Sequence, residues 1–496
     1  MTGRTAAVAA LLLLSTACGS TVQGSATLSA GTPQAGLGDG LGAAAPTADG
    51  LAAPGDPVAV GSAVETASPV VPGRTQTGAV SVPAEGPASV GSGPTTSTVL
   101  PGATSTTITV GVIAADPSAN EAMENAGLGA AAVGNEPANW KAAAEEINAR
   151  GGIGGRQVEL LFHLVNLTDP PAVQGQAACA RFTEDSTVAV VLSGYFYGPA
   201  HSCLSQQGVP ALLGTNYGVD RTSAQQTQTV LAWATPLLDR LAARLPDAYQ
   251  KLGRLTSGTS AGIFVTDAPA FRRSAAQLER ELTRRGLRVS TQTVRDSETG
   301  DYSGASGDAS AAVLQFRSAG VTEVLFLTRN AFEPALLMQA ANSQGYEPTY
   351  LLSTQQYPAA LVGLVPASQL DGALALGWAP AVDLSTGYDA RPEAQRCLAA
   401  LEKRGRSFSS NVQALAALLA CDGLDLLARA ADRPGALSSR QDLLAAALAA
   451  GNGFPSAVTY PTAFPGGRRD GVASYRPMAF SGGCGCFSYT GTISPM

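Results

Sequence analysis

Residues 258–262 read Gly-Thr-Ser-Ala-Gly, which matches by letter the G-x-S-x-G pattern around the nucleophilic serine of many hydrolases. In those enzymes the serine lies on a sharp turn between a strand and a helix, and a histidine later in the chain is its base. Here the pattern precedes its predicted strand, and the two histidines, His163 and His201, both lie upstream of Ser260. The sequence holds no other catalytic constellation, so we predict that the protein is not an enzyme.

Metal and nucleotide sites find equally little support. Two histidines, without an H-E-x-x-H motif or a pair of C-x-x-C motifs, argue against zinc. The glycine run 151–155 follows a helix pattern and lacks G-K-[ST], so it is a turn rather than a phosphate-binding loop or a dinucleotide fingerprint. We expect no metal and no cofactor, and a disulfide rather than a metal site at Cys484-Gly485-Cys486.

Hydrogen-bonding and aromatic residues instead follow the predicted strands, at the point where each strand ends. In open parallel sheets, ligands bind beyond the carboxyl ends of the strands, where free N–H groups at helix N-termini suit carboxylates. Each residue taken alone is equally well explained as a helix cap, a loop residue or, for Phe271, a core residue. Such residues follow the ends of four predicted strands, and together these four loops favour a binding site. In this site Arg329 can pair with an anion. The candidate ligand-binding residues are Ser193, Tyr195, Thr215, Asn216, Phe271, Arg329 and Asn330.

The elements that must position these residues are strands alternating with helices of 10–15 residues. This alternation predicts βαβ units with helices on both faces of parallel sheets. The roughly 390 residues that follow residue 105 are too many for one open sheet, so two lobes are expected. A (β/α)8 barrel is the competing architecture, but its usual length is about 250 residues. The main predicted strands are 108–113, 158–164, 188–192, 210–213, 263–266, 323–327 and 349–352, and the helices are 139–149, 199–207, 271–285 and 332–343.

Composition sets the class of protein. A formal net charge of −7 argues against nucleic acid as a partner, because phosphate binding needs basic patches. Hydrophobic residues make up 45% of the chain, enough for a sizeable core. Residues 19–105 are almost wholly Gly, Ala, Ser, Thr, Pro and Val without an aromatic residue, which predicts a flexible tether. As a random coil, its ends would lie roughly 50 Å apart.

The first residues have the pattern of an export signal. Arg4 precedes a short apolar run from Ala6 to Leu14, and the small residues Ser15 to Ala17 lead to Cys18. The apolar run is about half of the roughly 20 residues that a membrane-spanning helix needs. We therefore predict a lipoprotein signal whose Cys18 becomes the lipidated N-terminus. Leu14 is one place further from the cysteine than is usual, and the alternative is a secreted protein whose Cys18 is discarded with the signal.

The segment Trp140–Leu160 resembles a known family most closely. Its sequence, Trp-Lys-Ala-Ala-Ala-Glu-Glu-Ile-Asn-Ala-Arg-Gly-Gly-Ile-Gly-Gly-Arg-Gln-Val-Glu-Leu, is similar to the first helix, turn and second strand of the branched-chain amino-acid-binding proteins. These are type I periplasmic substrate-binding proteins of ABC transporters. Asp301–Ser303, Leu314–Val324 and Leu337–Tyr350 resemble later parts of the family in the same order, and the resemblance covers about 107–450.

The resemblance implies an α/β fold of two doubly wound, Rossmann-like lobes joined by three crossovers. Lobe 1 would comprise 106–233 and 354–450, and lobe 2 would comprise 234–353 and 451–496. By position, Ser193 and Thr215 resemble the hydroxyl residues that hold the ligand carboxylate, and Phe271 resembles an aromatic residue of the second lobe. The family's acidic partner for an ammonium group is expected near Phe332, but Glu333 is offset from it by one residue.

The expected function is therefore capture of a small polar ligand, such as an amino acid or an amide, for delivery to an ABC transporter permease. The protein would act outside the cytoplasm, held at the bacterial cell membrane by its lipid anchor. Two alternatives are a ligand-sensing receptor without a transport role and a lipoprotein hydrolase.

Without Cys18, six cysteines remain, and an oxidising compartment favours disulfides. Six cysteines allow 15 connectivities. We choose the pairs that join cysteines 24 residues apart on consecutive predicted helices, together with the remaining close pair. For Cys179 and Cys203 the resemblance adds support, because the family often has a bridge there. The predicted disulfides are Cys179–Cys203, Cys397–Cys421 and Cys484–Cys486.

Overall fold

The structure is a computed structural model that describes residues 100–125, 132–166, 169–194, 200–214, 218–297 and 301–496. The contacts between residues of the chain fall into two compact units, Met1–Gly91 and Ser92–Met496. The described residues all belong to the second unit. Cys18 and the predicted tether lie outside the described residues. No helix in the described ranges is long and apolar enough to cross a membrane.

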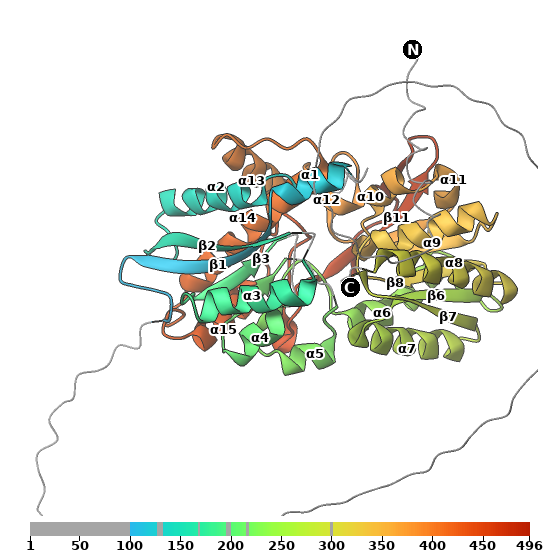
Figure 1. Ribbon diagram of the computed structural model, residues 1–496, viewed down its shortest axis with the longest axis horizontal. Coiled ribbons are helices and arrows are strands. Elements are labelled where there is room, and N and C mark those ends of the chain that lie inside the picture. Colours follow the sequence, from blue (N-terminus) through green and yellow to red (C-terminus); the bar gives the residue numbers. More distant parts are fainter. Residues whose placement is uncertain (1–99, 126–131, 167–168, 195–199, 215–217, 298–300) are drawn as a thin grey trace, which may run out of the picture. The chain divides into compact units, whose positions relative to one another are not determined.

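The first sheet has five parallel strands in the order β2-β1-β3-β4-β5. Helices α2, α13 and α14 cover one face, and α3 and α4 cover the other (Figure 1). Its strands are β1 Thr107–Ala115, β2 Gln157–Val165, β3 Val190–Ser193, β4 Ala211–Leu213 and β5 Val230–Ala232. The helices of this part are α1 Ser118–Asn125, α2 Glu136–Ala149, α3 Pro171–Thr183, α4 His201–Gln206, α5 Arg221–Gln226, α13 Pro392–Glu402, α14 Asn411–Ala431 and α15 Arg440–Ala450.

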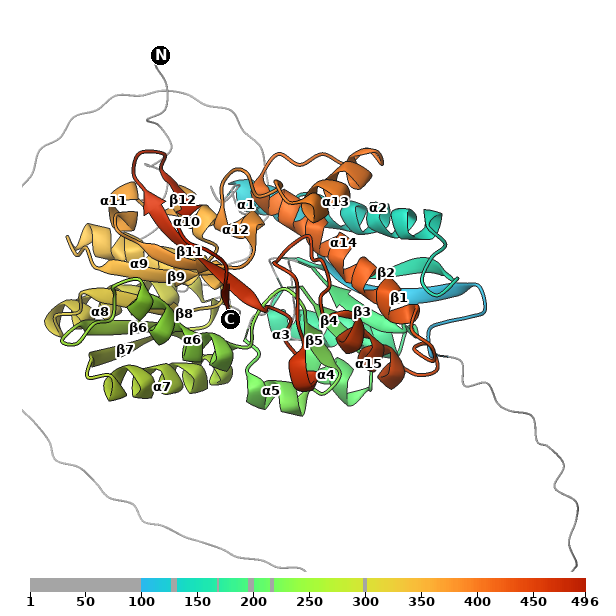
Figure 2. The same ribbon diagram turned by 180° about the vertical axis from the view of Figure 1, so that it is seen from behind.

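The second sheet has eight strands, with the order β12-β11-β10-β9-β8-β6-β7 and β13 paired to β11. Strands β6 to β10 are parallel, and the C-terminal strands are antiparallel (Figure 2). The strands are β6 Ser260–Thr266, β7 Arg288–Val294, β8 Glu323–Leu327, β9 Thr349–Ser353, β10 Leu374–Gly377, β11 Ser474–Ser481, β12 Cys486–Tyr489 and β13 Ser494–Pro495. The helices of this part are α6 Leu238–Lys251, α7 Pro269–Arg284, α8 Tyr302–Ser318, α9 Phe332–Ser343, η3 Thr354–Gln356, α10 Pro358–Leu364, α11 Ala367–Leu370 and α12 Pro380–Asp383. The short helix η4 Pro465–Gly467 lies in the segment 451–470, near the first sheet.

The glycine run after α2 is the turn that the sequence predicts. Gly152 has φ +79°, and a Cβ there would lie 1.9 Å from the carbonyl oxygen of Arg156, so no larger residue fits without a shift. Asn148 then fixes the helix to the next strand, because its amide group donates to the carbonyl of Val158 at 3.1 Å and accepts from the Val158 N–H at 2.7 Å. The run therefore sets the angle at which α2 leads into β2.

The expected boundaries between the two lobes need correction. Strand β10 pairs with β9 and β11 in the second sheet, although the sequence analysis assigned all of 354–450 to the first lobe. Conversely, residues 451–470 stay near the first sheet, since Asp470 bridges to Ala232 of β5. The sequence misplaced both boundaries because a strand of four residues and an irregular segment carry no periodic signal. In the described chain, three segments run between the sheets, at about 233–237, 378–391 and 471–473.

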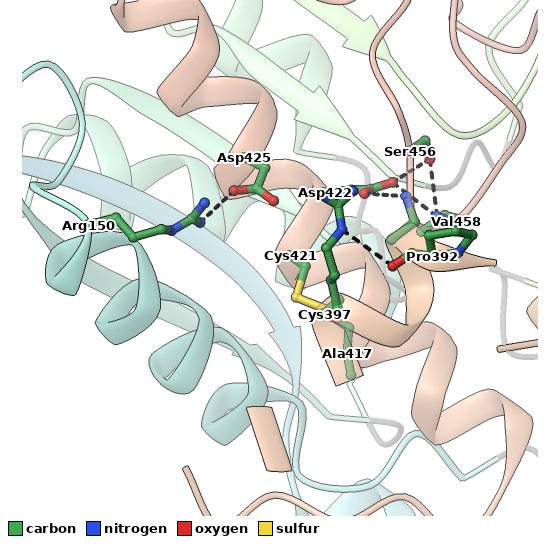
Figure 3. The surroundings of a disulfide bond; sticks show 11 residues. Arg150, Pro392, Cys397, Ala417, Cys421, Asp422, Asp425, Ser456 and Val458 are labelled. Atoms are coloured by element: carbon green, nitrogen blue, oxygen red, sulfur yellow. Dashed lines mark hydrogen bonds and ion pairs between the residues drawn. A yellow bond between two sulfur atoms is a disulfide. The ribbon is translucent and has the colours of Figure 1, made fainter. Parts of the chain in front are cut away.

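The structure joins the cysteines as predicted. Cys179–Cys203 links α3 to α4 and Cys397–Cys421 links α13 to α14 (Figure 3), each across 24 residues. Cys484–Cys486 spans the turn between β11 and β12. The first two bonds tie neighbouring helices of the first sheet.

Removal of a disulfide between helices should lower stability more than removal of the one in the turn. The double variant Cys397→Ala/Cys421→Ala should lose about 3 kcal/mol of unfolding free energy, because an unfolded chain without this cross-link gains loop entropy. Cys484→Ala/Cys486→Ala, whose loop holds one residue between the cysteines, should lose clearly less. Urea unfolding of both variants beside the wild type measures the difference. Equal losses would contradict the chain-entropy argument.

Candidate functional site

The carboxyl end of β3 is closely packed around a buried carboxylate. Ser193, the last residue of β3, is 1% exposed. A Cβ on the next residue, Gly194, would lie 2.5 Å from Oε1 of Glu136, so a larger residue would require the Glu136 side chain to shift. Oε2 of Glu136 accepts the backbone N–H of Ala115 at 2.8 Å, and Oε1 accepts Nε1 of Trp140 at 3.4 Å. Glu136 thus holds the ends of β1 and β3 at the start of α2.

Arg329 lies directly after β8 and is 6% exposed. Its guanidinium donates from Nε to Oδ1 of Asp296 at 2.7 Å and from Nη2 to the other carboxylate oxygen. The same group lies over the ring of Phe271, 5.4 Å from the ring centre, as a cation–π contact. A carboxylate of the protein therefore already balances much of the charge that the sequence analysis offered to an anionic ligand.

Phe271 is completely buried on α7, and it faces the other sheet across a glycine. A Cβ at Gly218, which has φ +125°, would lie 2.9 Å from Cε2 of Phe271 and 3.5 Å from Nη1 of Arg329. Gly218 follows β4 of the first sheet and precedes α5. Phe271 and Arg329, two of the candidate residues, thus meet the first sheet's loops at this glycine.

Asn330 has a different role in the structure. Its side-chain oxygen accepts the backbone N–H of Phe332 at 2.8 Å, in the turn just before α9, whose N-cap is Ala331. This local turn contact accounts for the oxygen. The backbone of the preceding residue, Arg329, is also held: its carbonyl accepts a hydrogen bond from Nε2 of Gln355 at 2.7 Å. Gln355 was not among the candidates.

An ion pair that the sequence analysis missed joins the two parts of the molecule. Arg273 on α7 donates from Nε to Oδ2 of Asp220 at 2.7 Å and from Nη2 to Oδ1 at 2.9 Å. Asp220 also caps α5, since Oδ1 accepts the N–H of Ser223 at 2.8 Å. Asp220 lies 53 residues before Arg273, and no local pattern in the sequence marks the two as a pair.

Two buried groups near Arg329 set the electrostatics. Burial and, to a smaller extent, the positive charge of Arg329 together lower the pKa of His201 to about 4, so this imidazole is neutral near pH 7. Burial raises the pKa of Glu333, which is completely buried. Its Oε1 accepts the hydroxyl of Ser297 at 2.7 Å, while Oε2 has no hydrogen-bond partner among the described residues.

The remaining candidates cannot be placed. Tyr195, Thr215 and Asn216 lie outside the described residues. They follow β3 and β4 in sequence, next to Gly194 and Gly218. Their assignment to the site stays a prediction.

The structure gives Ser260 no catalytic surroundings. It is the first residue of β6 and is 4% exposed, and its hydroxyl donates to the carbonyl of Ala319 at 3.2 Å. A nucleophile elbow would place the serine after a strand instead.

A cavity of the structure lies away from the candidate residues. A cavity of about 630 Å³ is lined by α2, α13, α14 and residues near 454–457, and none of the described candidates lines it. Its charges are largely paired, with Arg150 2.7 Å from Asp425 (Figure 3) and Arg396 3.8 Å from Glu393. We therefore do not place the ligand there.

Comparison with known proteins decides the family. A family model described as periplasmic binding protein matches residues 107–480. The chain belongs to this family. Its members are solute-binding proteins rather than enzymes, and the fold is the periplasmic binding protein type I fold, as the sequence predicted. A comparison with curated proteins found no match.

Solved structures agree on the fold of this periplasmic binding protein. An ABC transporter substrate-binding protein from Desulfitobacterium hafniense in complex with Leu is 17% identical, with a TM-score of 0.53 over 77% of this chain and 99% of that chain. A fatty acid ABC transporter substrate-binding protein from Thermomonospora curvata is 16% identical, with a TM-score of 0.56 over 80% and 95%. A solute-binding protein of an ABC transporter from Rhodopseudomonas palustris in complex with p-hydroxybenzoic acid is 14% identical, with a TM-score of 0.55 over 78% and 97%.

Two buried carboxylates, Asp383 on the second crossing segment and Asp422 on α14, should make stability depend on pH. Burial raises the pKa of Asp422 from 3.8 to about 7, and the same holds for Asp383. Because the folded state binds these protons more tightly than the unfolded chain, the stability they contribute is present near pH 4 and is lost as the pH rises through 7. Relative to Asp422→Asn, the wild type should therefore lose up to about 1.4 kcal/mol of unfolding free energy per pH unit in this range.

Urea unfolding at several pH values between 4 and 8 measures this difference. Asp425→Asn is the matched control, because Asp425 lies on the same helix but its side chain is 39% exposed. Its difference from the wild type should change little with pH. A difference for Asp422→Asn that is the same at pH 4.5 and pH 7.5 would contradict the prediction.

Proposed function

We propose that the ligand of this solute-binding protein lies where the carboxyl end of β3 faces the start of α7 and the end of β8. The observation that carries this proposal is the meeting of Phe271 and Arg329 with Gly218. There, Gly218 in a loop of the first sheet lies so close to the side chains of Phe271 and Arg329 from the second part that a Cβ on the glycine would touch both. Ligands of open α/β sheets bind at the carboxyl ends of strands, and both sheets present those ends here.

The charges favour a small solute that is neutral overall. Arg329 is balanced by Asp296, and His201 is neutral near pH 7, so the region carries no large excess of positive charge. Ser193 and Thr215 suit a carboxylate or amide oxygen, and Phe271 suits an apolar body. Glu333, with one oxygen that lacks a hydrogen bond among the described residues, would suit an ammonium group. An amino acid or an amide combines these features.

Ligand capture would work by closure of the two lobes. Contacts across the lobes, the Asp220–Arg273 ion pair and the approach of Phe271 to Gly218, hold the two sheets' loops together. A ligand that touches both lobes adds contacts that exist only in the closed state and so shifts the population toward it. The closed protein would then deliver its solute to an ABC transporter permease.

The protein would carry out this capture outside the cytoplasm at the membrane surface. Residues 4–17 have the pattern of an export signal, and Cys18 ends it as a lipidation site. Residues 19–105 would act as a tether between the lipid and the folded part. Acyl chains on Cys18 would hold the protein to the membrane, since a single chain binds only weakly.

A true ligand should be visible by thermal shift. At about 100 times its dissociation constant it adds about 2.7 kcal/mol to the stability of the folded state. Amino acids, amides and small carboxylates are the compounds to screen. Ser193→Ala with Thr215→Ala should abolish the shift while leaving the melting temperature of the free protein nearly unchanged. A full shift in this double variant would place the pocket elsewhere.

Gly218→Ala tests the meeting point of the lobes. The added methyl group would lie 2.9 Å from Phe271, so the ligand-induced shift should be lost. Gly208→Ala is the matched control, because Gly208 also has a positive φ, +65°, but nothing lies within 4 Å of its Cβ position. Both variants should lose stability from the backbone conformation, by about 1 kcal/mol for the control. Retention of the shift in Gly218→Ala, or its loss in both variants, would contradict the proposal.

Replacement of Cys18 tests the anchor independently of the ligand. Cys18→Ser removes the only group that can be acylated at the expected cleavage site, so the protein should move from the membrane fraction to the medium or periplasm. Detergent-free fractionation followed by immunoblotting measures this. Membrane retention of Cys18→Ser, or a soluble wild type, would argue against a lipid anchor.

A further inference from the structure

The turn between β11 and β12 carries a disulfide in an exposed position. Ser481 pairs with Cys486 at the end of the antiparallel ladder, and the connecting residues are Gly-Gly-Cys-Gly. Cys484 is exposed and Cys486 is half-buried, with a Cα–Cα distance of 5.2 Å. The glycines on either side of Cys484 add no side chain that could shield its sulfur atom.

The other two disulfides are shielded. Cys179 is 2% exposed and Cys397 is 7% exposed, and their partners Cys203 and Cys421 are half-buried. Both bonds lie between packed helices. Thiol–disulfide exchange needs an incoming thiolate to reach a sulfur atom along the line of the S–S bond, so access decides which bond reacts.

The hairpin is held by contacts that do not need its disulfide. Phe480 and Phe487 pair across the strands with ring centres 5.5 Å apart, and they are 8% and 2% exposed. At the end of β12, the hydroxyl of Tyr489 donates to Oδ2 of the buried Asp383 at 2.7 Å. The ladder from Met478 to Ser481 supplies the backbone pairing. Opening the bond would therefore leave the strands in place.

We propose that Cys484–Cys486 is a thiol–disulfide exchange site that low-molecular-weight thiols open and close in the folded protein. A thiolate attacks Sγ of Cys484, the S–S bond breaks, and Sγ of Cys486 leaves as a thiolate that takes a proton from water. A second thiol group then displaces Cys484 from the mixed disulfide. The protein disulfide gains two electrons, and the two thiol groups are oxidised to a disulfide. This site is separate from ligand capture.

Differential alkylation of the folded wild-type protein tests the proposal. Dithiothreitol is added for increasing times, free thiols are blocked with iodoacetamide, and the three bonds are quantified by peptide mapping. Cys484–Cys486 should open at least about tenfold faster than either helix–helix disulfide. Circular dichroism should stay unchanged while this bond alone is open. Equal rates, slower opening of Cys484–Cys486, or loss of structure on its opening would overturn the proposal.

Single variants test which sulfur atom is attacked. Cys486→Ser leaves an exposed thiol at Cys484, and Cys484→Ser leaves a half-buried thiol at Cys486. The first variant should react faster with dithionitrobenzoate, a disulfide that releases a coloured thiol. The reverse order would refute attack at Cys484. If either variant fails to fold, the alkylation rates of the wild type still decide the proposal.

Discussion

Buried carboxylates fix the segments that run between the two sheets, and the geometry of the proposed ligand region depends on them. Asp470, directly before the third segment, accepts the N–H of Leu237 at 3.2 Å and pairs with Arg240 at the start of α6. It therefore ties the first crossing to the third. Its pKa is raised by burial, while Arg240 acts in the opposite direction. An unpaired charge at this depth would be strongly unfavourable, so the pair must form for the segments to meet.

Two further buried carboxylates hold segments in place through hydrogen bonds, one a crossing segment and the other a loop near the first sheet. Asp383, on the second crossing, accepts from Thr354 at 2.7 Å and from Tyr489 at 2.7 Å, which joins the ends of β9 and β12. Asp422 on α14 accepts the N–H of Ala457 at 2.7 Å and so holds the loop that follows α15. Such bonds are directional, whereas apolar burial is not. These hydrogen bonds therefore fix the positions of the crossing segments. A hinge needs such fixed positions, because few residues connect the two sheets.

The sequence predicted most of what depends on neighbouring residues. The strand Glu323–Leu327 and the helix Phe332–Ser343 were predicted with their observed bounds, because a short run of four apolar residues after Glu323 and a helical pattern lie close together. The pairing of Cys397 with Cys421 followed from their spacing of 24 residues on consecutive predicted helices. The sequence did not predict strand β10, whose four residues show no alternation, or the partner of Asp220. Long-range packing decides both.

The candidate site shows the same limit more sharply. Arg329 was chosen as a free cation after a strand, yet its guanidinium is bidentate to Asp296, 33 residues earlier. Nothing in the local pattern of either residue marks them as a pair. A ligand carboxylate near Arg329 would have to compete with the carboxylate of Asp296, which the fold already holds in place. Asp296 has the advantage, because its binding to Arg329 costs no translational or rotational entropy. Arg329 therefore contributes more through its contact with the ring of Phe271 than by neutralising an anion. If the ligand binds where we propose, shape and hydrogen bonds would select the solute, with charge in a supporting role.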